Sequence, residues 1–487
     1  MKENTNQNSG ITLKLNYKRT FIIGFAFFGI LLLWQVYDSW CPTFLEKLFM
    51  EKLGSGNSKD VQYLVGIMMA LDNLAALILM PIFGRLSDRT RTPLGKRMPY
   101  ILVGTLVCSI TFPFIPLFYH MSNLAGLIVM MAVVVTFAMM YRNPAVALMP
   151  DLTPKPLRSK ANGIINIMGY IGGAFATVVG IIFVLTDYLG ESGNTWATNN
   201  IWAIEMPFII ASVLMVISAI VLAFTVRENE LEAKLASELE EGEKLAAVQD
   251  SVEHDDEKPM SKANLIMLLL ILVAEFFWFM SDNGITTFML NYSRNFLSTS
   301  SAGNMIMTII GGLGSVVGFA IGGYIADKIG RKWSITAGLS LTIIGLLIWL
   351  ICQNAVGKGT FKETIIVDGV SRDVYNFPWY LYIVWGLKGF GMSLVHINSF
   401  PMVVELCSKK KVGQFTGYYY IASMSAQTVT PMLLGLLLRI DGVEWSFLPI
   451  YALATSIISV IIFLFVKNIK NKKTDNLKGL EALGQDD

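Results

Sequence analysis

The sequence predicts an all-α membrane protein whose twelve transmembrane helices form two six-helix repeats. Of its 487 residues, 54% are hydrophobic and 15% are charged, whereas a soluble domain is typically about 45–50% apolar and about 25% charged. Twelve long runs of the chain carry almost no charge, and two of the loops between them repeat one motif. Composition, hydropathy and internal repetition therefore indicate the same fold class.

The twelve runs supply the predicted spans. A helix needs about 20 predominantly apolar residues to cross a hydrocarbon core of about 30 Å, so each run is a candidate. The first run is too long for the apolar region of a cleavable signal peptide, and we expect it to remain as a span. In chain order the runs cover residues 20–41, 61–86, 98–119, 124–149, 161–186, 201–226, 263–290, 303–326, 333–353, 378–406, 414–438 and 446–466.

The runs fall into two groups of six. Residues 20–226 form the first predicted bundle, and residues 263–466 form the second. The linker between them, residues 227–262, carries twelve acidic and five basic residues. We interpret it as a solvated amphipathic helix, with a partner-docking helix as the alternative. Its apolar face consists of Leu231, Leu235 and Leu239.

Positive charge predicts the orientation in the membrane. Lys and Arg are concentrated on the loops that share a side with both chain ends. Because cytoplasmic loops carry the excess of Lys and Arg, the N-terminal tail (1–19), the linker and the C-terminal tail (467–487) are predicted to be cytoplasmic. The lysines of the C-terminal tail suit an anionic inner leaflet. We expect a multi-pass protein of the cell membrane with both termini inside.

One loop motif occurs once in each bundle. Both copies read G-x-x-[SA]-D-[RK] followed by G-[RK]-[RK], and the first copy has four extra residues between the Asp and the second Gly. A glycine at a helix end permits close approach of a neighbour, and the Asp can accept hydrogen bonds from an Arg or from helix amides. Basic residues on inner loops set the topology of a membrane protein. In addition, the two copies of this motif are predicted to latch helices in one conformation and release them in another. The first copy comprises Gly84, Asp88, Arg89, Gly95, Lys96 and Arg97, and the second comprises Gly323, Asp327, Lys328, Gly330 and Arg331.

A second matched pair of acids belongs to the same predicted latch. Asp151 ends the fourth span and is followed by Arg158, while Glu405 ends the tenth span. Each acid precedes a glycine by twelve residues. Related halves joined by a polar linker are typical of membrane proteins whose repeats rock against each other around a midplane site.

The spans and the repeated loops resemble the major facilitator superfamily over essentially the whole chain. The lengthened first loop, Gly95 to Tyr100, resembles that of the sucrose/proton symporters and their bacterial relatives, and also that of the glycoside, pentoside and hexuronide cation symporters. Asn398 to Pro401 is similar to the bacterial branch of the sucrose-transporter relatives. The resemblance implies the major facilitator fold and a secondary active transporter that imports a sugar or glucoside, disaccharide-like in size, together with protons. Where melibiose-type sodium symporters carry an acid pair, this chain has Ala76 and Met80, which weighs against sodium coupling there.

Ionisable residues within the spans are the candidates for cation coupling. Such a side chain costs about 2.5–3.5 kcal/mol at a helix centre, so each needs a partner or a water-filled cavity. Asp72, near the middle of span two, is the first candidate, and Arg142 in span four is the leading buried cation. An acid and an Arg that separate during a cycle would bind and release a proton, and a static buried salt bridge is the alternative. Asp38, Glu275 and Asp282 are further coupling candidates.

Polar and aromatic residues of the spans are the candidates for substrate binding. Span seven contains Asp282, Asn283 and Gly284, a turn-favouring run that predicts a broken helix with polar groups for sugar hydroxyls, or else a simple kink. Trp278 offers a ring face for a pyranose, and Lys388 is a possible charge partner for an acid of span seven. Trp and Tyr also populate interfacial belts, which is the competing interpretation of these aromatics. The full set is Trp34, Tyr37, Asp38, Arg142, Trp278, Asp282, Asn283, Trp385, Lys388 and Asn398.

Several function classes are disfavoured. Four scattered cysteines and three scattered histidines show no metal-site spacing, so neither a metal nor another cofactor is expected. The net charge of +2 argues against a nucleic-acid partner, and the sequence holds no hydrolase, ATPase or heme motif, so we expect no enzyme. The expected partners are a sugar, a coupling proton rather than sodium, and the bilayer, with the chain as a monomer. A proton-coupled exporter of organic compounds and a sodium-coupled glycoside symporter remain as alternatives.

Overall fold

The computed structural model describes residues 14–154, 157–183, 204–251, 262–299, 301–367, 370–404, 406 and 412–467. The first part of the chain builds a set of long helices and one short 3-10 turn. These are α1 (Tyr17–Leu53), η1 (Ser58–Val61), α2 (Gln62–Arg89), α3 (Met98–Thr111), α4 (Phe114–His120), α5 (Leu124–Asp151), α6 (Arg158–Phe183) and α8 (Met206–Thr225).

The second part begins after a helix within the predicted linker, α9 (Glu228–Ser251). It contains further long helices and one β-hairpin. The elements are α10 (Lys262–Asn295), α11 (Ser301–Ile329), α12 (Arg331–Ala355), β1 (Phe361–Val367), β2 (Val370–Tyr375), α13 (Trp379–Val404), α14 (Val412–Leu438), η5 (Trp445–Phe447) and α15 (Leu448–Leu464). The two strands pair antiparallel.

Eleven segments of the described chain are long and apolar enough to cross a membrane, judged by length and composition. The pair α3 and α4 counts as one of them. The one predicted span outside this set, residues 378–406, corresponds to α13, a helix of 26 residues in which Lys388, His396 and Asn398 lower the hydropathy. At about 1.5 Å per residue α13 is long enough to span, and it packs between α11 and α12. The predicted all-α membrane fold is confirmed.

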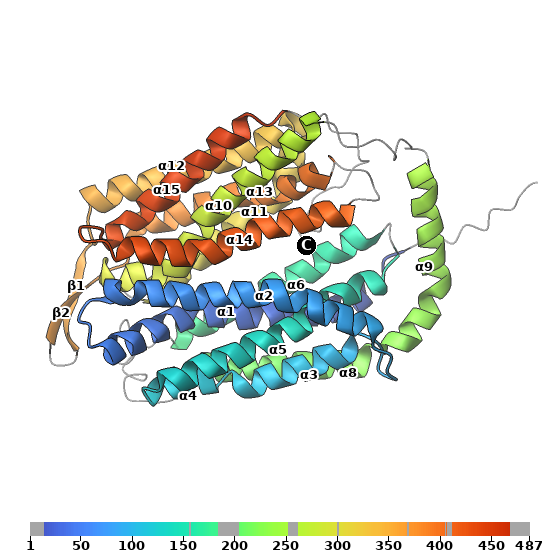
Figure 1. Ribbon diagram of the computed structural model, residues 1–487, viewed down its shortest axis with the longest axis horizontal. Helices are drawn as coiled ribbons and strands as arrows, with labels where there is room; N and C mark the ends of the chain where they lie inside the picture. Colours follow the sequence, from blue (N-terminus) through green and yellow to red (C-terminus); the bar gives the residue numbers. More distant parts are fainter. Residues whose placement is uncertain are drawn as a thin grey trace, which may run out of the picture.

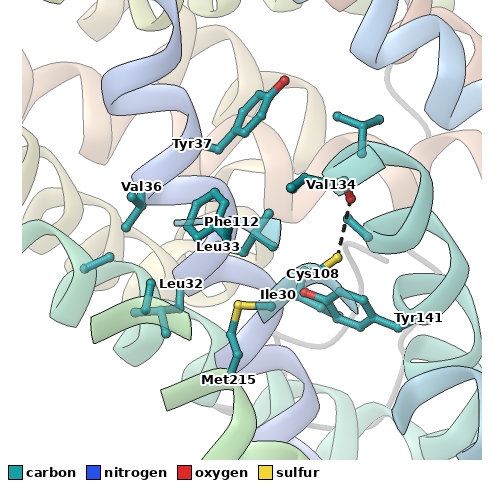
Figure 2. Close-up of a cluster of buried hydrophobic side chains, with 14 of the residues drawn as sticks. Ile30, Leu32, Leu33, Val36, Tyr37, Cys108, Phe112, Val134, Tyr141 and Met215 are labelled. Carbon is teal, nitrogen blue, oxygen red and sulfur yellow. Dashed lines mark hydrogen bonds between the residues drawn. The ribbon is translucent and has the colours of Figure 1, made fainter. Parts of the chain in front are cut away.

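The helices form two bundles that lie against each other (Figure 1). One hydrophobic core gathers buried side chains almost entirely from α1 to α8, and two further clusters come from α10 to α15. Figure 2 shows part of the first core, where Leu33, Phe112 and Met215 pack together and the Cys108 thiol donates to the Val134 carbonyl oxygen at 3.4 Å. Each bundle therefore has its own interior, as expected of two repeats that move as separate bodies.

Two features mark the opposite ends of the molecule. Helix α9 crosses one end, and the hairpin of β1 and β2 projects from the other (Figure 1). We call these the linker end and the hairpin end. The predicted apolar face of α9 meets the first bundle, because Leu235 is buried and Leu231 packs against the first core.

Toward the hairpin end the two bundles are closed against each other. Asn291 of α10 accepts a hydrogen bond from the Thr43 hydroxyl and donates one to the Gln62 side-chain oxygen, both at 3.3 Å. Lys59 of η1 forms an ion pair with Glu444 at 2.5 Å. These contacts join α1, η1 and α2 of the first bundle to α10 and the segment before η5 of the second.

Glycines allow the helix backbones to meet at this closure. A β-carbon on Gly66 of α2 would lie 2.0 Å from the Pro431 carbonyl oxygen, and one on Gly435 of α14 would lie 2.6 Å from the Gln62 carbonyl oxygen. Small residues at such a crossing permit close helix packing inside a membrane. The closure therefore rests on backbone contact between α2 and α14 as well as on polar side chains.

The predicted break in span seven is wrong. Helix α10 runs without interruption from Lys262 to Asn295, through the Asp282-Asn283-Gly284 run. A membrane strongly favours internally paired backbone groups, which outweighs the turn preference of these residues. Gly284 instead serves packing, because a β-carbon there would lie 2.8 Å from the Tyr451 ring of α15.

Candidate functional site

A cavity lies between the bundles, on the linker side of the closure. It consists of two adjoining chambers of about 360 and 300 Å³. Helix directions place the larger chamber nearer the hairpin end and the smaller nearer the linker end, and we call them the hairpin-side and linker-side chambers. Both are lined by Asn73, Ala76, Arg142 and Gln427. Ligand sites in proteins are typically concave pockets of about 300–1,000 Å³, so each chamber lies at the lower end of that range.

Asp72 lines the hairpin-side chamber, and Tyr37 holds it from the core of the first bundle. The Tyr37 ring belongs to the core of the first bundle, and its hydroxyl points away from the apolar cluster (Figure 2). That hydroxyl donates a hydrogen bond of 2.6 Å to Asp72 Oδ2. Helix α1 thereby orients the acid of α2 that lines the chamber.

Arg142 and Asp38 face the same chamber. The two side chains interact electrostatically, whereas no ion pair joins Arg142 to any residue that the structure describes. The predicted pairing of Arg142 with Asp72 is therefore not seen in this conformation, where Asp72 is held by Tyr37. Arg142 instead presents its donors to the cavity, at the point where the two chambers meet.

Two more polar groups of the hairpin-side chamber lack partners. The Trp34 indole N–H and the Asn283 side-chain oxygen are buried atoms with no hydrogen-bond partner among the described residues. Thr286 and Thr287 line the same wall. A buried polar group without a partner costs free energy comparable to a lost hydrogen bond. The chamber thus offers both donors and acceptors to a polar ligand.

The second bundle contributes a closed ion pair. Lys388 of α13 contacts Asp282 of α10 at 2.5 Å, as one of the predicted pairings has it. The Lys388 amine also lies 5.6 Å from the centre of the Trp385 ring, which is buried behind it. His396, which lines the linker-side chamber, interacts electrostatically with Asp282 and Lys388. The charges of Lys388 and Asp282 neutralise each other, whereas Arg142 has no ion pair among the described residues.

Seven of the predicted binding and coupling residues do not line either chamber: Tyr37, Glu275, Trp278, Asp282, Trp385, Lys388 and Asn398. Trp278 is 1% exposed and packs edge-on against Phe463 of α15, so it is a core residue and the predicted sugar contact is not supported. Asn398 is buried and donates to the Ser334 hydroxyl at 3.1 Å, which ties α13 to α12. Glu275 is fully buried, and neither carboxylate oxygen has a hydrogen-bond partner among the described residues.

Sequence reasoning missed several residues of the cavity. Asn73 donates to the Gln427 carbonyl oxygen at 3.2 Å and joins the bundles where the chambers meet. In the sequence, this part of α2 is marked by the charged neighbour, Asp72. His396 also lines the linker-side chamber, beside Phe279, with ring centres 5.4 Å apart. Asn73 and Gln427 are uncharged, and insertion cost alone does not single them out.

The first loop motif forms a charge cluster at the linker end of the first bundle. Arg97 contacts Asp88 at 2.5 Å and Asp151 at 2.9 Å, and it donates to the Ser87 hydroxyl at 2.5 Å. Lys96 also pairs with Asp151, at 3.1 Å. The Arg97 side chain is 8% exposed. The motif therefore ties the end of α2 and the start of α3 to the end of α5.

The linker adds an unpredicted acid to this cluster. Glu228, the first residue of α9, is buried and accepts hydrogen bonds from the backbone N–H groups of Arg97 and Met98. A carboxylate at the start of a helix is favourable because the first amides have no intrahelical partner. Gly95 has φ +111°, a backbone conformation that favours glycine. A β-carbon on it would also lie 2.5 Å from that of Glu228, so a larger residue would not fit there. The signal in the sequence is an acid two residues after the end of span six.

The remaining predicted latch residues are less connected. Gly84 lies against Asn143 of α5, Arg89 is exposed, and Arg158 donates to the Thr153 carbonyl oxygen at 3.1 Å. In the second copy, Gly323 lies within α11, the Lys328 amine lies 4.4 Å from the centre of the Tyr324 ring, Gly330 with φ +86° precedes α12, and Arg331 begins it. Glu405 and the Asp327 side chain lie outside the described part of the chain.

Among the described residues, no group of three or more His, Cys, Asp or Glu side chains could hold a metal ion.

The sequence matches the model of the Major Facilitator Superfamily over residues 24–370 and 267–484. Because the matches cover most of the chain, this protein belongs to that superfamily. It is a multi-pass membrane transporter for small molecules and not an enzyme. No curated protein matches the sequence.

Solved transporters share the fold. The POT family transporter PepTSo has a TM-score of 0.63 at 13% identity, covering 93% of this chain and 98% of its own. The xylose transporter XylE from E. coli, in a partially occluded inward open conformation, has a TM-score of 0.61 at 13% identity, covering 94% and 100%. A mutant of the nucleoside transporter NupG has a TM-score of 0.60 at 12% identity, covering 93% and 100%. Identities this low show the common architecture alone.

Proposed function

We propose that this transporter is a proton-coupled symporter that imports a sugar or glucoside by alternating access. The observation that carries the proposal is the lining of the hairpin-side chamber. It includes Arg142, which has no ion pair among the described residues, and the side chains of Trp34 and Asn283, whose indole N–H and amide oxygen have no hydrogen-bond partner there. A sugar hydroxyl both donates and accepts hydrogen bonds, so one class of ligand satisfies all three groups. The resemblance of the first loop to that of the sucrose/proton symporters supports the same class.

Asp72 is the proposed coupling acid. It lines the chamber and holds one hydrogen bond from Tyr37, which leaves its second oxygen available to a proton or to the substrate. Asp38 and Arg142 share the chamber, so protonation of one acid changes the field felt by the others. Because Asp72 lines the same chamber as the proposed sugar-binding residues, binding of the proton can depend on binding of the sugar, and the reverse.

The conformation fits one stage of an import cycle. The predicted orientation places the linker end in the cytoplasm, and the closure by Lys59–Glu444, Asn291 and the α2–α14 backbone contact then lies on the outer side. The cavity extends from this closure toward the linker end. We therefore assign the conformation to the inward-facing state, from which a sugar would leave for the cytoplasm.

The charge cluster around Arg97 is the proposed latch of the first bundle. Its contacts with Asp88 and Asp151 hold α2, α3 and α5 together, and Glu228 connects them to the start of the linker. The corresponding role for the second motif, with Lys328 and Arg331, follows from the repeat in the sequence.

Uptake into proteoliposomes tests the proposal. Labelled disaccharides and glucosides are offered with an imposed proton gradient, with an imposed sodium gradient, and with none. We expect accumulation only when protons flow inward. Accumulation that follows the sodium gradient would assign the coupling ion to sodium, and gradient-driven expulsion of the label would make the protein an exporter. Absence of transport for every sugar would overturn the proposal.

A further inference from the structure

Aromatic rings make up a large part of the lining of the linker-side chamber. Five aromatic side chains line it, from four helices of both bundles: Tyr170, Phe279, Phe319, Tyr419 and Tyr420. The hairpin-side chamber contains one aromatic residue, Trp34, among its lining. The two chambers therefore differ in chemistry although they adjoin.

The rings are held in defined positions. Tyr170 of α6 and Phe319 of α11 face each other across the two bundles, with ring centres 6.3 Å apart and planes at 38°. Tyr419 shares a hydrogen bond of 2.9 Å with the Ser399 hydroxyl. Phe279 lies against the His396 ring. Side chains fixed in this way lose little freedom when a ligand binds.

A pyranose ring has an apolar face of C–H groups as well as a rim of hydroxyls. The rim suits the partnerless donors and acceptors of the hairpin-side chamber, and the C–H face suits aromatic rings, which prefer apolar contact with their faces. A ligand with a second ring would extend past Arg142 and Gln427, which border both chambers, into the ring-lined space.

We propose that the linker-side chamber is a second subsite, which binds the apolar face of the second ring of a two-ring ligand: the second sugar of a disaccharide or the aromatic group of an aryl glycoside. The inference rests on the proposed sugar transport and adds to it the part of the site that selects for length. Tyr170 and Tyr420 are the specificity residues of this subsite, and Arg142 marks the boundary with the first.

Ligand binding to the purified full-length protein tests the subsite. Glucose and galactose, a disaccharide of each, and the phenyl glycoside of each are titrated by calorimetry into the wild type, Tyr170→Leu and Tyr420→Leu. The matched control is Tyr324→Leu, because Tyr324 is an exposed tyrosine of α11 that does not line either chamber. We expect the wild type to bind a two-ring ligand at least about tenfold more tightly than the one-ring sugar.

The variants separate the subsite from the proposed function. Tyr170→Leu and Tyr420→Leu are expected to weaken two-ring ligands by about fivefold to tenfold, while the one-ring sugar changes by less than about twofold. The control is expected to leave both affinities unchanged. Equal weakening of one-ring and two-ring ligands, or equal affinity of the wild type for both, would overturn the subsite while sugar transport stands. Failure of the wild type to bind any sugar would overturn the proposed function and the subsite with it.

If disaccharides respond to the tyrosine variants and phenyl glycosides do not, the second ring is a sugar. The reverse result identifies an aromatic group. Either result supports an apolar ring subsite, whereas a loss of affinity caused only by Arg142 variants would assign length selection to the hairpin-side chamber and contradict it.

Discussion

The two bundles differ in how their charged residues in and near the cavity are paired. In the first bundle, Asp72 is held by one hydroxyl, and Arg142 has no ion pair among the described residues. In the second bundle, Lys388 and Asp282 neutralise each other at 2.5 Å. A charge that already has its partner is costly to disturb, whereas one without a partner can take up a ligand or a proton. The comparison suggests that binding and coupling belong to the first bundle and that the ion pair of the second is structural.

Asp72→Asn should have the largest effect on this division. The amide keeps the shape and can still accept from Tyr37, but it cannot carry a proton. We expect gradient-driven sugar accumulation in proteoliposomes to be lost, while exchange of sugar without a gradient persists. The control is Asp441→Asn, because Asp441 is exposed at the hairpin end. Unimpaired accumulation in Asp72→Asn would move the coupling role to another acid, first to Asp38 or Asp282.

Arg142→Gln should weaken sugar binding strongly and leave the fold intact. Hydrogen bonds to charged groups contribute about 1.5–3 kcal/mol, which corresponds to about a tenfold to hundredfold loss of affinity. Calorimetric titration of the purified protein measures the change. Arg85→Gln is the matched control, because Arg85 is an exposed arginine of α2. An affinity within twofold of the wild type would place the sugar elsewhere.

Lys388→Met tests the structural side of the comparison. The variant leaves Asp282 without its partner, and the loss of stability should be below the about 3–5 kcal/mol that breaking a buried pair costs, because the Asp282 side chain is 30% exposed. We expect a lower Tm in detergent, largely restored in the double variant Lys388→Met/Asp282→Asn. A double variant that is stable but binds no sugar would show that the ion pair takes part in binding.

The smallest expected effect is the difference in sugar affinity between Trp34→Phe and Trp278→Phe. Removal of one neutral hydrogen bond costs about 0.5–1.5 kcal/mol, so Trp34→Phe is expected to lower sugar affinity about twofold to tenfold. Trp278→Phe should leave the affinity unchanged, because Trp278 packs against Phe463 in the core. The two titrations are made side by side. The opposite order of effects would restore the role predicted for Trp278 from the sequence.

The fold was predictable because a bilayer imposes a length and a composition on each helix. The spans and their grouping follow from hydropathy, and the charged candidates follow from the cost of inserting Asp72, Arg142 and Lys388 into a membrane. Those rules do not depend on how the helices face one another. Hydropathy and insertion cost therefore identify the charged residues of the spans, but they do not predict which residues these interact with.

The errors share one physical reason, which is that packing decides the orientation of uncharged side chains. Trp278 and Asn398 have the chemistry of a sugar site, but their faces of α10 and α13 meet other helices of the same bundle. The run at Gly284 favours a turn in water, yet the membrane and the nearby Tyr451 ring keep α10 continuous. Glu228 was missed because its role depends on the loop amides of Arg97 and Met98, which lie far from it in the sequence.

Sugar-driven proton entry tests whether Asp72 carries the coupled proton. Proteoliposomes with a pH-sensitive dye inside receive sugar outside, without an imposed gradient, and the internal pH is recorded for the wild type and for Asp72→Asn. We expect internal acidification on addition of sugar to the wild type, and none in the variant although labelled sugar still enters. Equal acidification in both would show that the proton does not travel by Asp72 and would contradict the assignment of coupling to this acid.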